Sequence, residues 1–218
     1  MKEGIYKRHW KDKTYPENLL ALPENERPEL LYVSGKIKKS DRKAVSIVGS
    51  RKTTTYGRKM AEKFAKELAE NNITIVSGLA RGIDTVAHMG ALRAGGRTIA
   101  VMGCGLDIIY PPENKLLAKK IRGNGALVSE FSLGTKPHAK NFLTRNRIIS
   151  GLSLAVLVVE GAERSGTLST AAWAASQGRE VFAIPGPINS PLSAAPLFLI
   201  ENGAQIARSP KDILDVVI

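Results

Sequence analysis

TRNRIISGLSLAVLVVEGAERSGTLSTAAWAA, residues 144–175, contains the pattern that decides the fold. An apolar run from Leu154 to Val159 lies between Gly151 and Gly161, and its length and β-branched residues are typical of a buried strand in a parallel sheet. Ser165-Gly166-Thr167 follows and opens an alanine-rich segment that we expect to be helical. A strand, a turn of small residues and a helix N-terminus form an anion site, because free N–H groups and the positive end of the helix dipole point at the turn.

The same alternation of strands and helices runs through the chain from Ala44 onward. Short apolar runs predict strands, and apolar residues at helical spacing predict the helices between them. We expect strands at 30–33, 44–48, 73–77, 98–102, 126–130, 154–159, 180–184 and 204–207, and helices at 57–71, 82–93, 113–122, 165–175, 195–202 and from Pro210. This rhythm predicts an α/β fold, an extended Rossmann-like, doubly wound and mostly parallel sheet with helices on both faces.

The first part of the chain differs in composition from the rest. Residues 1–29 are polar and contain Pro16, Pro23 and Pro28, so we expect a loosely structured segment there. We therefore expect two parts, an N-terminal lead-in with a short strand over 1–43 and a Rossmann-like domain over 44–218.

Positive charge is abundant and unevenly distributed. The net charge is +12 and the sequence pI is about 9.9, which favours a polyanionic partner, although a charge surplus can also serve solubility alone. Residues 36–43 (KIKKSDRK) carry five positive charges and one negative charge, and residues 136–147 carry four positive charges and no negative charge. The second cluster lies next to the expected anion site, which supports a polyanionic ligand.

Other features narrow the class of protein. A single cysteine, Cys104, excludes an internal disulfide and fits a reducing cytosol, so we expect a cytoplasmic protein. The N-terminus MKEGIYKRHW lacks the apolar region of a signal peptide, and no apolar run has the length of a membrane span. One cysteine and three scattered histidines argue against a zinc site, and we expect neither a metal nor a cofactor.

Small residues mark the carboxyl end of nearly every expected strand. In parallel sheets ligands bind beyond these ends, and glycine lets the backbone approach a ligand closely. We therefore expect one shared ligand surface built from Gly49-Ser50, Ser77-Gly78, Gly103 to Gly105, Ser165-Gly166 and Pro185-Gly186.

The chemistry of this edge suits phosphate. The chain lacks the G-x-G-x-x-G fingerprint after its first long strand, a P-loop and a G-x-S-x-G elbow. The first turn carries Arg51 instead, whose guanidinium can bind phosphate through two hydrogen bonds. Phe142, within the second basic cluster, could stack a base of single-stranded nucleic acid, although a core position would explain it equally well.

Candidates for catalysis are few. Asp84 and His88 stand four apart on one helix and could share a proton or a metal, but we favour a helix cap for Asp84 and a structural role for His88. Glu160 could act as an acid or base, but we prefer a role in holding the Ser165 turn or an arginine. Cys104 has no spacing that implies a nucleophile.

Arg145 and Arg147 constrain each other. On a regular helix, residues two apart point in directions about 200° apart. We therefore expect that, if this segment is helical, one arginine faces the ligand and the other braces the fold.

Six long motifs, in order along the chain, resemble the DNA-processing protein A family, also called DprA or Smf. They are VGSRKTTTYG (48–57), IVSGLARGIDTVAH (75–88), TIAVMGCGLDIIYPPEN (98–114), FLTRNRIISGLS (142–153), VVEGAERSGTL (158–168) and GREVFAIPGPI (178–188). With YPENLLAL (15–22) and LLYVSG (30–35), the resemblance covers about residues 15–218. Residues 193–197 (SAAPL) depart from the glycine and polar residue that are usual there, so this edge of the pocket is expected to differ.

The resemblance implies a sequence-independent single-stranded DNA-binding protein rather than an enzyme. Such proteins protect incoming strands in natural transformation, help to load the RecA recombinase, and usually act as homodimers. The resemblance places these residues at the DNA: Gly49, Ser50, Arg51, Phe142, Arg145, Arg147, Ser165 and Gly166, with Lys136, Lys140 and Arg164 around them. From the strand-end turns we add Ser77, Gly78 and Thr167. Many members also carry a helical or winged-helix accessory domain, for which we expect no room in these 218 residues.

Two other functions stay open. The first is a nucleotide-binding or nucleotide-hydrolysing protein like the phosphoribohydrolases. These enzymes have a Gly-Gly-x-Gly-Thr-x-x-Glu turn, which the stretch GAERSGTL loosely resembles. The final glutamate of that turn is absent here, because Thr170 and Ala171 stand where it is needed. The second is a structural partner protein whose charge is incidental.

Overall fold

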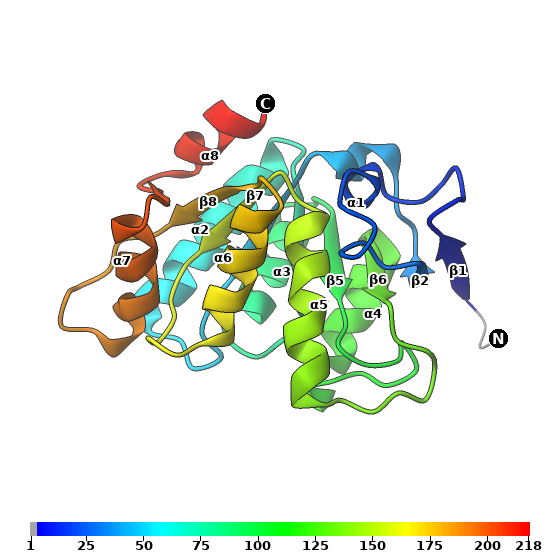
Figure 1. Cartoon of the computed structure of the whole chain (residues 1–218). Helices are drawn as coiled ribbons and strands as arrows, with labels where there is room; N and C mark the ends of the chain where they lie inside the picture. The colour runs from blue at the N-terminus through cyan, green and yellow to red at the C-terminus, as the bar shows by residue number, and fades with distance from the viewer. Residues whose placement is uncertain (1–3) are drawn as a thin grey trace.

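The apolar runs of the sequence form the strands of one sheet. The computed structural model describes residues 4–218, and within this range the sheet has nine strands (Figure 1). They are β1 (Ile5–His9), β2 (Leu30–Gly35), β3 (Ala44–Val48), β4 (Thr74–Ser77), β5 (Thr98–Val101), β6 (Ala126–Ser129), β7 (Ala155–Val158), β8 (Glu180–Ala183) and β9 (Gln205–Ile206).

The strand order creates a switch point in the middle of the sheet. The order is β1-β2-β6-β5-β4-β3-β7-β8-β9, and the strands from β6 to β9 are parallel while β1 and β2 add an antiparallel edge. The chain builds outward from β3 in one direction through β6 and returns to start the other half at β7. In doubly wound sheets a ligand crevice forms where the order reverses, which here is between β3 and β7.

Helices cover both faces of the sheet (Figure 1). One face carries α2 (Thr55–Glu70), α3 (Ile83–Arg93), α4 (Lys115–Asn124) and α8 (Pro210–Val217), and the other carries α1 (Glu17–Leu20), α5 (Ala139–Gly151), α6 (Gly166–Ser176) and α7 (Ala194–Glu201). Short 3₁₀ turns are η1 (Lys39–Arg42), η2 (Pro112–Asn114) and η3 (Pro191–Ser193). The expected mostly parallel α/β fold is confirmed.

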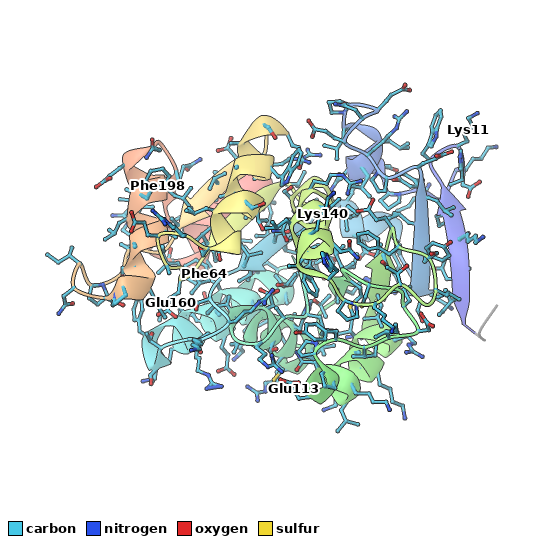
Figure 2. All side chains as sticks on the ribbon, turned by 60° about the horizontal axis from the view of Figure 1, so that its bottom comes forward. Lys11, Phe64, Glu113, Lys140, Glu160 and Phe198 are labelled. Carbon is cyan, nitrogen blue, oxygen red and sulfur yellow. The ribbon has the colours of Figure 1, made fainter. Side chains whose placement is uncertain are left out.

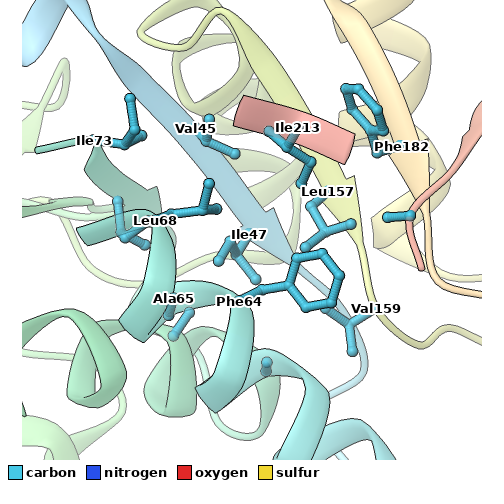
Figure 3. Close-up of a cluster of buried hydrophobic side chains, with 14 of the residues drawn as sticks. Val45, Ile47, Phe64, Ala65, Leu68, Ile73, Leu157, Val159, Phe182 and Ile213 are labelled. Carbon is cyan, nitrogen blue, oxygen red and sulfur yellow. The ribbon is translucent and has the colours of Figure 1, made fainter. Parts of the chain in front are cut away.

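Alternation along β3 shows how the two cores arise. Val45 and Ile47 point to the layer of α2, where they pack with Phe64 (Figure 3). Ala44 and Val48 point to the opposite layer, where they join the cluster of Ile148 from α5. All five residues of β3 are buried, as expected of a central strand that is covered on both faces.

The N-terminal segment is more ordered than the sequence suggested. Residues 5–9 form β1, and Tyr15, Leu19 and Leu22 are buried in the core beneath α1 and α5. The expectation of a loosely structured lead-in is therefore wrong, because isolated apolar residues among polar ones give no periodic signal. The boundary expected at 43/44 falls between η1 and β3, and residues on both sides of it share the sheet.

The structure also bears on membrane insertion. Across residues 4–218, none of the helices combines the length and the apolar character that a membrane crossing requires.

Candidate functional site

A cleft of about 800 Å³ opens at the switch point between β3 and β7. Its volume is in the range of ligand pockets. The loop after β3, the N-terminal half of α5 and the N-terminus of α6 form its walls. The predicted residues that line it are Gly49, Ser50, Arg51, Phe142, Arg145, Ser165, Gly166 and Thr167.

The loop after β3 is fastened at both sides. The Ser50 amide donates to the Glu160 carbonyl oxygen at 2.7 Å, and the Ile83 amide donates to the Ser50 carbonyl oxygen at 3.1 Å. A Cβ atom at residue 49 would lie 2.6 Å from Cγ1 of Ile83 and 2.9 Å from the Glu160 carbonyl oxygen, so glycine is required for this close approach. The fastened turn holds the exposed Arg51 side chain at the mouth of the cleft.

Cations and aromatic rings meet at Phe142. The guanidinium carbon of Arg51 lies 5.5 Å from the centroid of the Phe142 ring, and that of Arg145 lies 5.9 Å from it. The Tyr110 ring lies against the Phe142 ring, with 5.5 Å between the two ring centroids. Such distances allow cation–π attraction, and they place two positive charges beside an aromatic platform.

Arg145 connects the cleft to the core. Its buried Nη1 donates to the Gly78 carbonyl oxygen at 2.9 Å and to the Val101 carbonyl oxygen, at the ends of β4 and β5. Burial lowers the pKa of Arg145 to about 10, partly offset by the charge of Asp84, so the guanidinium is still positive at neutral pH. Arg145 therefore contributes fixed positive charge to the inner wall.

Arg147 lies on another side of α5. Its guanidinium forms a bidentate ion pair with Glu130, in which Nη1 donates to Oε1 at 2.6 Å and Nη2 donates to Oε2 at 2.7 Å. Arg147 does not line the cleft. As the helix geometry predicted, the two arginines point in different directions, with Arg145 at the cleft and Arg147 at Glu130. The inclusion of Arg147 among cleft residues is corrected, because a regular helix turns it toward Glu130.

Five more predicted residues lie outside the cleft lining. The Ser77 hydroxyl is buried and donates to the Ile47 carbonyl oxygen at 2.7 Å. Gly78 lies behind the wall, where an added Cβ would meet Arg145 and Asp84. Lys136, Lys140 and Arg164 are exposed on the loops and the first turn of α5 that adjoin the cleft lining. Figure 2 shows Lys140 on α5.

The N-terminus of α6 offers open backbone donors. Ser165 is its N-cap residue, and the N–H groups of Gly166 and Thr167 have no hydrogen-bond partner among residues 4–218. A Cβ atom at Gly166 would meet nothing within 4 Å, so the space beside this turn is open. The side chain of Asn146 donates to the Gly166 carbonyl oxygen at 3.2 Å and so sets α6 against α5.

Glu160 has a different role from the one that the sequence favoured. Its Oε2 accepts from the Thr54 amide at 3.1 Å and its Oε1 accepts from the Thr54 hydroxyl. The same hydroxyl caps α2 by accepting from the Gly57 amide at 3.0 Å. A role at the Ser165 turn or at an arginine is therefore wrong; Glu160 fixes the start of α2.

Asp84 and His88 are also engaged in the fold. Asp84 Oδ2 accepts from the amides of Gly78 and Ala80 at 3.1 and 3.3 Å, so it fastens the loop before α3 and is not the cap residue, which is Gly82. His88 is buried, its Nδ1 lies 2.7 Å from the Thr98 hydroxyl, and burial lowers its pKa to about 3. The preferred structural role of His88 agrees with this placement.

Within residues 4–218, neither a metal site nor a reactive thiol is evident. In the part of the chain that the structure describes, no group of three or more histidine, cysteine, aspartate or glutamate residues could hold a metal ion. Burial raises the pKa of Cys104 to about 11, which keeps the thiol protonated and poorly nucleophilic.

The cleft also contains residues that sequence reasoning missed. They include Lys52, Tyr110, His138, Asn146 and Leu192. Lys52 and Asn146 are next to predicted residues in the sequence, and Tyr110 belongs to one of the family motifs. Their positions in the sequence could therefore have indicated that they lie at the cleft. Leu192 comes from η3, whose approach to the cleft depends on tertiary packing.

Comparisons with known proteins find relatives in sequence and in overall structure. Protein Smf of Escherichia coli (strain K12) is 49% identical over 202 residues, which cover 92% of this chain and 54% of that protein, so the chain spans about half the length of this relative. The structure of DNA processing protein A (DprA) from Streptococcus pneumoniae superposes with a TM-score of 0.90 at 42% identity, covering 98% of this chain and 74% of the other.

The match with a third relative extends over nearly the whole length of both chains. This relative is DNA processing protein A from Helicobacter pylori, whose structure is described as showing a unique single-stranded DNA binding mode. It has a TM-score of 0.86 at 31% identity and covers 97% of this chain and 94% of the other. The family model for DNA recombination-mediator protein A matches residues 8–217. With this match and the relatives above, the chain belongs to the DNA recombination-mediator protein A family, known as DprA or Smf.

Proposed function

We propose that this chain binds single-stranded DNA without sequence preference in the cleft at the switch point. The observation that carries the proposal is the exposed Arg51 guanidinium beside the Phe142 ring, across from the open N-terminus of α6. A cation, an aromatic face and free amides are the groups that bind phosphates and stack bases. The binding mode described for the Helicobacter pylori relative supports it.

Each part of the cleft has a task in this proposal. Phosphates bind to the Gly49-Ser50-Arg51 turn and to the amides of Gly166 and Thr167, with Ser165 beside them. A base stacks on Phe142, and because every base has a π face the contact tolerates any sequence. Lys136, Lys140 and Arg164 add long-range attraction from the surrounding surface.

Family membership supports a wider role. We propose that the chain protects incoming strands and loads the RecA recombinase onto them in natural transformation and recombination, and that it acts as a homodimer in the cytoplasm. The family match and relatives named for DNA processing support this role. RecA-dependent strand exchange with and without the chain tests loading, and sedimentation tests the dimer.

Binding without catalysis is part of the proposal. The carboxylate oxygens of Glu160 are both bonded to Thr54, and Asp84 is bonded to two backbone amides. These contacts argue against the alternative of a nucleotide-hydrolysing protein, whose candidate acid is Glu160. Release of free base from a nucleotide, lost in Glu160→Gln, would favour the alternative.

The decisive experiment compares two arginines. Arg51→Ala should weaken binding of oligo-dT by roughly ten- to a hundredfold, since a charge-assisted hydrogen bond is worth about 1.5–3 kcal/mol. Arg58, exposed on α2 and outside the cleft lining, is the matched control, and Arg58→Ala should leave the affinity nearly unchanged. Binding that resists both Arg51→Ala and added salt would overturn the cleft proposal.

A further inference from the structure

A second positively charged surface lies at the end of the sheet opposite the cleft, where the amino ends of the parallel strands are. Lys36, Lys38, Lys39, Arg42 and Lys43 are all exposed around η1, beside the amino end of β3. In Figure 1 this blue segment is at the top, next to α1, whereas the cleft end of α5 is at the bottom. Within residues 4–218 none of these five side chains forms an ion pair.

The acid within this run is neutralised internally. Buried Asp41 accepts from Arg97 Nε and Nη2 at 2.7 and 2.8 Å, from the Thr74 hydroxyl at 2.8 Å and from the Lys38 amide at 2.7 Å. Arg97 also donates to the Lys36 carbonyl oxygen at 2.7 Å. These bonds fix the backbone of the segment and leave its cations uncompensated, so the surface is a preorganised positive patch rather than a solvated tail.

The patch contains a hollow of about 130 Å³. Four exposed cations in its lining, Lys13, Lys38, Lys39 and Arg42, form what we call the amino-edge surface. Two acids also line it: Asp41, which is paired with Arg97, and Glu17, which has no ion-pair partner among residues 4–218. The volume is below the range of pockets that hold organic ligands, but it admits a phosphate group. The chemistry therefore favours the phosphate of a larger polyanion whose remainder stays in solvent.

Helix α5 connects the hollow with the cleft. Its N-cap residue, His138, lines the cleft, and its C-cap residue, Leu152, lines the hollow. Both sites lie on the layer of α1, α5 and α6. A helix of 13 residues is about 20 Å long, so one extended strand can reach both sites.

We infer that the amino-edge surface binds phosphates of the same single strand whose other part occupies the cleft. The inference rests on the proposed function and adds a second contact region to it. It predicts that long strands gain affinity from these cations and that strands short enough to fill only the cleft gain none.

The test uses a triple variant and a matched control. Lys38→Gln/Lys39→Gln/Arg42→Gln removes three charges from the amino-edge surface, and Lys119→Gln/Lys120→Gln/Arg122→Gln removes three exposed charges from α4. Affinities are measured across a salt series for oligo-dT of about 4 and about 30 nucleotides. The short strand is at the lower limit of the site sizes of single-strand binders, and at about 3.4 Å per nucleotide it is about 14 Å long, too short to reach from the cleft to the hollow. Thermal unfolding confirms that both variants fold.

For the long strand, the amino-edge variant should lower the slope of log K against log salt by up to about 2, because each lost contact with a single strand contributes about 0.7. Its affinity for the short strand should match that of the unmodified chain, and the α4 variant should change neither slope. Equal slope losses in both variants, or none in either, would overturn the inference.

Two further outcomes separate the alternatives. A second short strand per chain that disappears in the amino-edge variant would assign the surface to a separate strand and overturn the inference. If the unmodified chain binds no short strand, the proposed cleft function fails, whereas intact short-strand binding with an unchanged long-strand slope rejects only the inference.

Discussion

Gly103 leaves the space that the ring of Phe142 occupies: a Cβ atom at residue 103 would lie 2.5 Å from Cδ1 of Phe142. Gly103 is one of the strand-end glycines at which we expected the protein backbone to approach a ligand closely. Its small size instead admits the aromatic ring, and so positions the platform rather than the DNA.

Gly103→Ala should therefore weaken DNA binding through Phe142. The ring must shift, and base stacking on an aromatic side chain is worth about 1–3 kcal/mol, so the affinity for oligo-dT should fall roughly ten- to a hundredfold. Fluorescence anisotropy measures this loss. The control is Gly123→Ala in α4, where an added Cβ meets nothing within 4 Å; equal effects of the two substitutions would contradict the proposed platform.

Gly166→Asp should separate stability from binding. The open space at Gly166 accepts a side chain, and a negative charge in the first turn of α6 should raise the free energy of unfolding by about 0.3–1 kcal/mol through the helix dipole. The same charge should repel phosphate and strongly reduce affinity for oligo-dT. Gly166→Ala is the uncharged control, and a tighter complex with Gly166→Asp would refute an anion site there.

Arg147→Ala should act on the fold rather than on the cleft. The side chains of Arg147 and Glu130 are 13% and 17% exposed, so removing the arginine leaves a largely buried carboxylate unpaired. The free energy of unfolding should fall by about 1–3 kcal/mol, between the effects of surface and buried pairs, with unchanged affinity for a short strand. Denaturant titration of the single variants and the double Arg147→Ala/Glu130→Ala variant measures the coupling.

A pair on the surface provides the comparison for Arg147. Lys211 and Asp215 form an exposed ion pair on α8, and Lys211→Ala should change stability by less than about 1 kcal/mol. If Arg147→Ala abolished DNA binding at unchanged stability, Arg147 would belong to the binding site after all.

His88 should make stability depend on pH. Its pKa is about 3 in the fold, because burial disfavours the charged ring, and about 6.5 in the unfolded chain. The unfolded state thus binds more protons below pH 6.5, so the contribution of His88 is complete above that pH and is lost as the pH falls toward 3.

The measurement compares denaturant unfolding of the chain and of His88→Gln between about pH 7 and pH 5. The unmodified chain should lose more stability over this interval than the variant does. Burial raises the pKa of Asp84, so this residue increases stability as the pH falls. Its contribution is the same in both proteins and does not affect their comparison. Equal pH dependence in the two proteins would show that His88 does not titrate on unfolding in this range.

The central fold could be predicted because its strands are buried on both faces. Runs such as Ala44–Val48 are apolar throughout apart from Ser46, and a glycine follows the run. The apolar pattern and the glycine therefore indicate the same strand boundary. The N-terminal strand β1 could not be predicted in this way. Its residues IYKRH are polar in part and only half-buried at the sheet edge, and its place depends on pairing with β2.

The site was predictable where chemistry lies in a strand-end turn. Arg51 and Gly166 could be found because turn position alone takes them to the cleft. Arg147 and Ser77 could not be separated from these, because the direction of a side chain depends on helix phase and on partners such as Glu130 that are distant in sequence. The role of Glu160 depended on Thr54, 106 residues earlier.

The antiparallel edge strands have a consequence for the order in which the chain assembles on the ribosome. β2 is synthesised well before its partner β6, so Gly35 cannot pair with Ala126 until the intervening residues have emerged. β3 likewise finds its partner β7 only after three other strands have been made. Non-local pairing of this kind is slow and exposes unpaired strands meanwhile. The lysines and arginines of residues 7–13 and 36–43 lie in β1 or next to β1 and β2. While these strands are still unpaired, the mutual repulsion of the charges keeps nascent chains apart.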